Sequence, residues 1–178
     1  MKLQKNQDGF TLVEVSVGIL ISSIILLFAS GMVLSGSNLF FANTNRSEAR
    51  QIGDAVFHHI SEELTYAKHV QIFPDEATAA GTAVGGHTIT VTDGRLHTAA
   101  GDVFGEAFYL GRTVTFTATV HTFSELDLSV SVLDKNGTEV YTTTSTINVL
   151  NMKLAGEGIE DFSGDVLNPY ITYEQQGG

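Results

Sequence analysis

One uninterrupted apolar stretch near the N-terminus limits what this chain can be. Between Phe10 and Leu34 the only ionisable side chain is Glu14. A helix needs about 20 apolar residues to cross a bilayer, and this run is long enough to do so. A carboxylate within such a helix is costly, so it indicates a functional site with a partner. The sequence therefore predicts a transmembrane helix over residues 10–34 with a functional acid near its start.

A mostly polar leader, residues 1–9, precedes the apolar run, and residues 9–14 read Gly-Phe-Thr-Leu-Val-Glu. This arrangement resembles the processing site of type IV pilins and pseudopilins, and it departs from their usual pattern at Asp8. The resemblance implies that a prepilin peptidase removes the leader by cutting between Gly9 and Phe10.

The same resemblance implies how the mature subunit behaves. The Phe10 amine that cleavage exposes is expected to be N-methylated, and Glu14 is expected to act in filament assembly. Expected partners are other pilin or pseudopilin subunits, bound through the N-terminal helix, the prepilin peptidase and an inner-membrane assembly platform. The subunit is expected to be a single-pass membrane protein with a cytoplasmic N-terminus and an exported head, which reaches the cell surface in the filament.

The charges that flank the apolar run do not fix its orientation by themselves. Lys2 and Lys5 precede it, and Arg46 and Arg50 follow it, so the positive-inside comparison is a tie. A conventional secretory signal is the rival interpretation. Its apolar region would span only about 7–15 residues and end at a small-residue cleavage site. The longer run here favours a retained anchor.

A second helical pattern follows, over residues 35–72. We expect one helix from Phe10 to about Val70, because Pro74 cannot continue it. The closing Ala-Lys-His-Val at residues 67–70 resembles minor pilins of the W/J type. Apolar side chains recur at steps of three and four, as on one face of an α-helix, and they are Ala49, Ile52, Val56, Ile60, Leu64 and Ala67.

The remainder of the chain, residues 73–178, is predicted to form an antiparallel β-sheet head. Neither this sheet nor the helical stripe can bury its apolar face alone, so the two should pack together. The predicted fold class is α+β, with a long N-terminal helix on the sheet. Strands are expected at residues 88–92, 95–98, 104–110, 113–120, 126–132 and 138–150, with tight turns at residues 93–94 and 134–137. Residues 75–86 are predicted to be a loop and residues 151–178 to be irregular.

Composition and spacing disfavour several kinds of chemistry. The chain has no cysteine, so it can form neither a disulfide nor a thiolate metal site. A net charge of −11 makes broad nucleic-acid binding unlikely. The histidines lack ligand spacing, and the turn at Asp134 and Asn136 lacks the calcium-loop pattern. We predict no cofactor and no metal. A solvated surface is the first interpretation, and calcium binding the alternative, for an acidic cluster of Glu157, Glu160, Asp161 and Asp165.

Three functions are consistent with these features to different degrees. The first is a structural subunit, a minor pilin or pseudopilin of a type IV pilus, a type II secretion system or a competence system. The second is a filament-tip subunit whose head binds a surface, an exported protein or DNA, and it differs from the first only in the head. The third, a membrane-anchored enzyme, needs a convergent polar site, and no catalytic motif stands out in the sequence. We therefore predict that the protein is not an enzyme.

Overall fold

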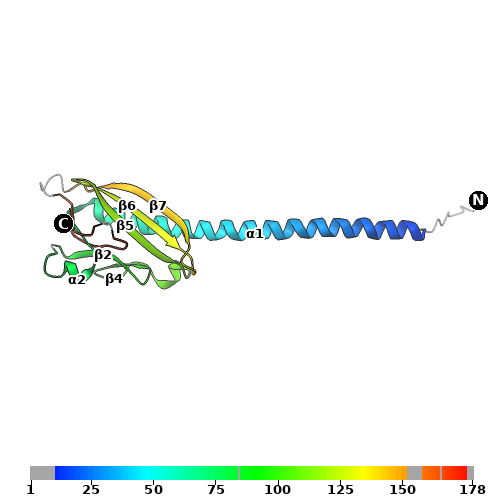
Figure 1. Cartoon of the computed structure of the whole chain (residues 1–178), viewed down its shortest axis with the longest axis horizontal. Coiled ribbons are helices and arrows are strands. Elements are labelled where there is room, and N and C mark those ends of the chain that lie inside the picture. Colours follow the sequence, from blue (N-terminus) through cyan, green and yellow to red (C-terminus); the bar gives the residue numbers. More distant parts are fainter. Residues whose placement is uncertain (1–10, 84, 152–157, 165, 176–178) are drawn as a thin grey trace, which may run out of the picture. The chain divides into compact units, whose positions relative to one another are not determined.

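The structure is a computed structural model that describes residues 11–83, 85–151, 158–164 and 166–175. The chain divides into two compact units, one ending at Thr44 and one beginning at Asn45. Helix α1 (Leu12–Thr65) contributes to both units. All the strands belong to the second unit, which we call the head (Figure 1). A long helix packed on largely antiparallel sheets confirms the predicted α+β fold class.

Six strands form the larger sheet of the head, in the order β4-β3-β2-β9-β1-β8. The strand β9 pairs antiparallel with both β1 and β2, so the last strand of the chain lies in the middle of this sheet. The short β8 pairs in parallel with β1. The bounds are β1 (Ala67–Phe73), β2 (His87–Thr92), β3 (Arg95–Thr98), β4 (Gly101–Asp102), β8 (Glu160–Asp161) and β9 (Tyr170–Gln175).

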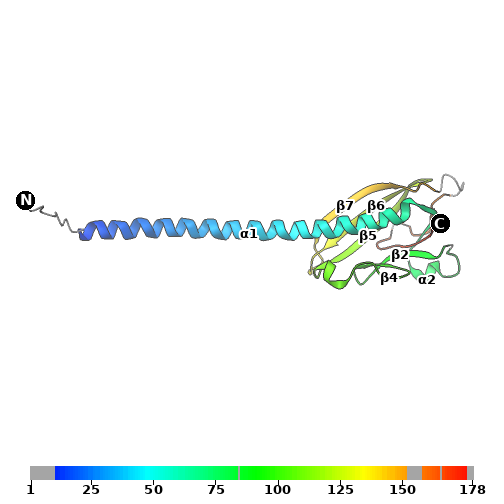
Figure 2. The same cartoon turned by 180° about the vertical axis from the view of Figure 1, so that it is seen from behind.

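The smaller sheet is an antiparallel meander of β5 (Thr113–Thr122), β6 (Glu125–Leu133) and β7 (Glu139–Asn148). Its inner face is apolar and its outer face carries threonine and serine, which confirms the alternation predicted from the sequence. The hairpin turn predicted between β2 and β3 is also present, with Asp93 at φ 51° and Gly94 at φ 71°. The two sheets lie side by side in the head (Figure 1, Figure 2).

The helical stripe predicted from the sequence is the inner face of the head portion of α1. Its five helical members, Ala49, Ile52, Val56, Ile60 and Leu64, are each no more than 2% exposed. They share one core with the inner faces of both sheets, which confirms the predicted packing. Figure 2 shows this part of α1 in front of the strands. The buried stripe is what fixes the helix on the sheets.

Helix α1 ends at Thr65, before the predicted end near Val70, so the predicted amphipathic half is too long. The following segment, Ala67–Phe73, is β1 instead, and the 67–70 motif lies inside this strand. In β1 the segment gains strand partners on both sides, β9 and β8. Its Val70 and Ile72 are fully buried and belong to the core of the head.

The predicted strand at residues 104–110 is wrong, because the chain turns there into a 3-10 helix, η1 (Glu106–Tyr109). The turn directs Tyr109 inward, where its hydroxyl accepts a hydrogen bond from the Leu96 N–H at 2.9 Å. It closes at Leu110, which has φ 53°, and Gly111, which has φ 74°. Two left-handed residues in succession end any extended pairing.

The predicted loop at residues 75–86 contains a short helix, α2 (Glu76–Ala79). The Asp75 carboxylate caps it by accepting hydrogen bonds from the N–H and hydroxyl of Thr78, at 2.7 and 2.8 Å. These bonds hold the pKa of Asp75 below its usual value. The signal was a local Asp-x-x-Thr capping pattern that a search for hydrophobic periodicity does not detect.

The prediction that residues 151–178 are irregular is also wrong in part, because β8 and β9 lie there. The segment Tyr170–Gln175 begins with aromatic and β-branched residues, which favour strands. Its partners β1 and β2 lie far earlier in the chain, so no adjacent hairpin signalled the pairing.

Gly53 marks the closest approach of α1 to the smaller sheet. A Cβ atom added there would lie 2.8 Å from Cδ1 of Tyr141 and 3.1 Å from Cγ2 of Val132. The Tyr141 ring cannot swing away freely, because its hydroxyl donates to Oδ1 of Asp54 at 2.7 Å. The helix therefore contacts β6 and β7 more closely than a larger residue would permit.

We expect the effect of Gly53→Ala on the free energy of unfolding to depend on whether Tyr141 is present. Alanine favours a helix over glycine by about 1 kcal/mol, but overpacking a core costs about 1–3 kcal/mol. In the Tyr141→Ala background the two closest contacts are gone and only the looser one with Val132 remains, so the cost of Gly53→Ala should fall or change sign. Urea unfolding of the four variants in a double-mutant cycle checks this, and additive effects within about 0.5 kcal/mol would contradict the contact.

Candidate functional site

The N-terminus of α1 is closed by a reciprocal contact between Thr11 and Glu14. The Thr11 hydroxyl oxygen accepts from the Glu14 N–H at 3.3 Å. Oε2 of Glu14 in turn accepts from the Thr11 N–H and from the Thr11 hydroxyl, both at 2.9 Å. This is a capping box, which satisfies N–H groups that have no partner within the helix. The carboxylate also lies in the first turn, where the helix dipole favours negative charge.

The two hydrogen bonds that the Glu14 carboxylate accepts from Thr11 both reach Oε2. Its other oxygen, Oε1, accepts no hydrogen bond from any residue that the structure describes. The carboxylate is thus fixed by one oxygen while the second is free to bind a donor from outside the chain. The predicted cleavage and methylation residues, Gly9 and Phe10, lie outside the described residues.

The first unit exposes an apolar surface along its described length. Its large apolar side chains are exposed from Leu12, at 86%, to Phe41, at 64%. By length and composition α1 could cross a membrane. Five hydroxyl side chains recur along α1 at intervals of seven residues, and they are Ser16, Ser23, Ser30, Ser37 and Thr44. Each hydroxyl donates to the backbone carbonyl four residues earlier, at 2.7–3.0 Å, so none of these five brings an unpaired donor into an apolar environment.

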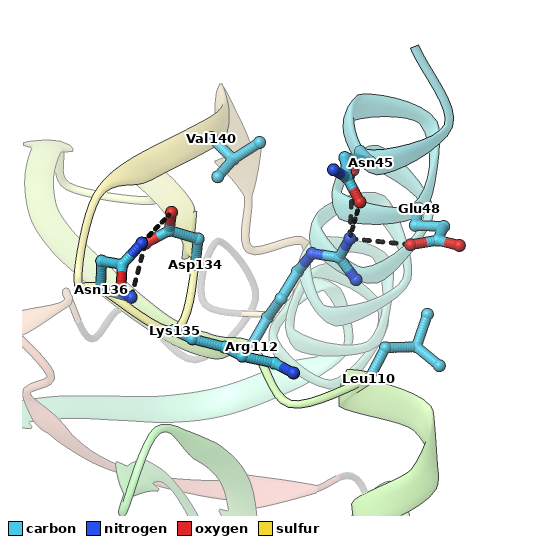
Figure 3. Close-up of a pocket in the computed structure, with 8 residues that line it drawn as sticks. All are labelled: Asn45, Glu48, Leu110, Arg112, Asp134, Lys135, Asn136 and Val140. Carbon is cyan, nitrogen blue, oxygen red and sulfur yellow. Dashed lines mark hydrogen bonds and ion pairs between the residues drawn. The ribbon is translucent and has the colours of Figure 1, made fainter. Parts of the chain in front are cut away.

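The head contains a groove of about 450 Å³ where the loop before β5 meets α1 (Figure 3). Arg112 reaches across it and donates to Oε2 of Glu48 at 2.7 Å and to the backbone and side-chain oxygens of Asn45 at 3.4 Å. Only 9% of the Arg112 side chain is exposed, so its charge is almost buried and is paired. The groove is lined by Asn45, Glu48, Leu110, Arg112, Asp134, Lys135, Asn136 and Val140.

On the other wall of the groove, the Asp134 carboxylate stabilises the turn between β6 and β7. The Asp134 carboxylate accepts from the N–H groups of Asn136 and Thr138, at 2.8 and 2.9 Å, and these bonds lower the pKa of Asp134. Figure 3 shows Asp134 and Asn136 turned toward each other. The charges of Arg112 and Asp134 are therefore engaged in holding the fold, and the groove is a structural junction.

Four of the histidines in the head contact separate carboxylates. The closest such contact joins Nδ1 of His97 to Oδ1 of Asp102 at 2.8 Å. Among the described residues, no group of three or more histidines and acids is arranged to hold a metal ion. The other pairs are His58 with Glu62, His69 with Glu160, and His121 with Asp127.

The acidic cluster predicted near the C-terminus is divided by the structure. Glu160 accepts from the Gln71 side chain at 2.6 Å, and Asp161 accepts from the Ser163 N–H at 2.8 Å. These two acids therefore have partners within the fold. The other two, Glu157 and Asp165, lie outside the described residues.

Comparison with known families matches one part of the chain. The model of the prokaryotic N-terminal methylation motif matches residues 4–30. This motif indicates a type IV pilin-like precursor. Such a precursor is processed by a prepilin peptidase, and the pilin-type family is structural in character. Together with the apolar helix, the motif supports membrane anchoring and a pilus-like surface filament.

The match ends within the first unit, so it says nothing about the head. No curated protein and no solved structure matches the sequence. The Arg112–Glu48 junction was also missed by sequence reasoning, because its members are 64 residues apart and neither stands in a motif. The approach of β5 to α1 alone brings them together.

We expect Glu48→Ala to destabilise the head by about 1–3 kcal/mol, because it removes the closest and only charged acceptor of the almost buried Arg112 guanidinium among the described residues and leaves it the longer bonds to Asn45. Glu48→Gln should cost less, since an amide oxygen can still accept. Arg50→Ala is the matched control, because the Arg50–Asp54 pair is exposed and should contribute less than about 1 kcal/mol. Urea unfolding measures all three, and equal losses for Glu48→Ala and Arg50→Ala would contradict the junction.

Proposed function

We propose that this chain is a minor pilin or pseudopilin, a structural subunit of a type IV pilus-like filament. A prepilin peptidase cuts between Gly9 and Phe10, and the new Phe10 amine is N-methylated. The helix of residues 10–34 then anchors the subunit in the membrane with its N-terminus in the cytoplasm and its head exported. The inner-membrane platform adds the subunit to the filament through its helix.

The observation that carries this proposal is the methylation-motif match over residues 4–30, together with the exposed apolar side chains of α1 from Leu12 to Phe41. That apolar surface needs lipid before assembly and other helices after it. The head adds support, because its core is complete within the second unit and leaves the first unit available for neighbours.

The Glu14 carboxylate supplies the chemistry of assembly in this proposal. Oε2 is held by Thr11, and Oε1 has no partner among the described residues. The charged Phe10 amine of a neighbouring subunit is a donor of the right sign for Oε1. In a medium of low dielectric such a pair is far stronger than in water, where exposed pairs contribute little. Pairing therefore lowers the free energy of burying both charges and sets the register of two helices.

The processing step predicts the mature N-terminus. Protein isolated from its native membrane should begin at Phe10 and carry one additional methyl group on its amine. Gly9→Leu should block the cut and leave residues 1–9 attached, because the peptidase of this family cuts after glycine. Intact-mass and N-terminal peptide mass spectrometry measure both. A native protein that retains Met1 to Gly9 would refute the processing.

The assembly role predicts an order among three variants. Glu14→Gln preserves the capping box, in which glutamine also serves, but removes the charge, whereas Glu14→Ala removes both. Thr11→Val removes the capping hydroxyl and leaves the carboxylate. We expect both Glu14 variants to enter filaments roughly tenfold less or worse, since even about 1.4 kcal/mol is a factor of ten. Thr11→Val should retain most incorporation.

Quantitative immunoblotting of sheared filaments against the membrane fraction measures this incorporation, and the membrane fraction shows that each variant is made. If Glu14→Gln behaved like the wild type while Glu14→Ala and Thr11→Val were both deficient, Glu14 would be a helix cap without an assembly role.

A further inference from the structure

The strand β7 is a sheet edge that nothing in the described chain covers. It ends the order β5-β6-β7 and pairs only with β6. It begins with the charged Glu139 and a register shift at Val140, but from Tyr141 to Asn148 it contains no proline and no charged residue, and its pairing with β6 is regular. Natural proteins usually block such an edge with lysine, proline or a bulge, because it can add a strand from another chain. Figure 1 shows β7 at the margin of the head.

The opposite edge of the same sheet is covered by the protein itself. The Val114 N–H of β5 donates to the Gly94 carbonyl at 2.9 Å. Asn168 engages Phe116 twice: its N–H donates to the Phe116 carbonyl at 2.8 Å, and its Oδ1 accepts from the Phe116 N–H at 2.9 Å. One edge is thus closed by specific hydrogen bonds while the other is left open.

The register shows which backbone groups of β7 are open. The Val149 N–H donates to the Ser124 carbonyl just beyond the paired residues. Hydrogen-bonded pairs alternate in an antiparallel ladder, so the N–H and C=O groups of Thr142, Thr144 and Thr146 point away from β6. No residue in the described ranges donates to them or accepts from them. Their side chains lie on the exposed outer face.

We propose that the β7 edge binds the β7 edge of a second copy of this chain, antiparallel and centred on Thr144. In that register Thr144 faces itself and Thr142 faces Thr146, so every outward-pointing backbone group of these threonines gains a partner. On the outer face, hydroxyls already pair between β6 and β7, Ser129 with Thr144 and Ser131 with Thr142, each at 2.8 Å. The threonines of the second copy would extend these rows of neighbouring hydroxyls across the new contact. Thr–Thr pairs across strands are favourable neighbours.

The absence of charge at this edge allows a second copy to bind there. Two copies with a net charge of −11 repel each other over most of their surfaces. The stretch from Val140 to Asn151 has no charged side chain, so an edge-to-edge pair places no like charges directly opposite each other. The threonine pattern at 142, 144 and 146 is also symmetric about its centre, as a self-complementary two-fold contact requires.

The two-fold symmetry of this contact determines the relative orientation of the two subunits. A two-fold axis normal to the sheet reverses every direction within the sheet plane, including that of the head portion of α1 packed on it. The two subunits therefore have opposite polarity. Such a pair links two filaments or two free subunits, and it closes after two copies, so it is distinct from the contacts that would build one filament. It requires no role for Glu14.

Single cysteines test the register, because the full-length chain has none of its own. Thr144→Cys in detergent-solubilised full-length protein should form a disulfide-linked dimer under mild oxidation. Thr119→Cys, on the outer face of β5, is the control. It keeps the same N-terminal helix, so any dimerisation through that helix affects both variants equally. We expect Thr144→Cys to cross-link roughly tenfold faster or more, because directly opposed Cα atoms about 5.5 Å apart lie within disulfide reach. Equal rates for the two variants would overturn the proposal.

A charge exchange at the two-fold axis gives a second test. One chain carries Thr142→Cys with Thr144→Lys, and the other carries Thr146→Cys with Thr144→Glu. Their mixture should cross-link, whereas the same cysteine pair with lysine at position 144 in both chains should lose most of the cross-linked product. Circular dichroism before oxidation shows that each variant is folded. Indifference of the yield to the sign of the two charges would refute self-pairing at Thr144, whatever the outcome for Glu14.

Discussion

The apolar surface of the first unit is the constraint on which the rest of this structure depends. Burying one large apolar side chain is worth about 1.5–3 kcal/mol, and the residues from Leu12 to Phe41 include many such side chains that the chain itself does not cover. The subunit therefore has to be completed from outside, by lipid or by other helices, and the methylation motif at its start accords with both.

The head meets the opposite requirement, because it must be stable when its helix is engaged elsewhere. Both sheets close on the buried stripe of α1, and Gly53 lets the smaller sheet approach closely. The Arg112–Glu48 junction then ties the loop before β5 to the beginning of the head portion of α1. The last strand, β9, completes the larger sheet between β1 and β2. The hydroxyl of its Tyr173 donates to Glu63 at 2.6 Å, so the end of the chain is also fixed to α1.

Sequence reasoning succeeded where the determining interactions are local or periodic. The stripe from Ala49 to Leu64, the Asp93-Gly94 hairpin and the alternation of β5 and β6 are all of this kind. Prediction from the sequence failed where a segment's local sequence suits a helix and a strand about equally. In such a segment, pairing with a strand that is distant in the sequence determines the conformation. Ala67–Phe73 becomes a strand because β9 lies beside it, and β9 was missed because its partners are remote. The candidate site divides in the same way: Glu14 was apparent from its isolation in an apolar run, whereas its contact with Thr11 needed coordinates.

That contact changes the physical account of the buried acid. A bare carboxylate in an apolar helix would be tolerable only once a neighbour neutralised it. Here the Thr11 N–H and hydroxyl already bind one oxygen, and the first turn of the helix adds a favourable dipole. In the proposed assembly, the subunit waits in the membrane with its acid partly satisfied, and the approach of a neighbour need not break the cap, because Oε1 accepts no bond from the described residues. On this view the capping box prepares the carboxylate for assembly, since it holds the acceptor in a defined direction before the second charge arrives.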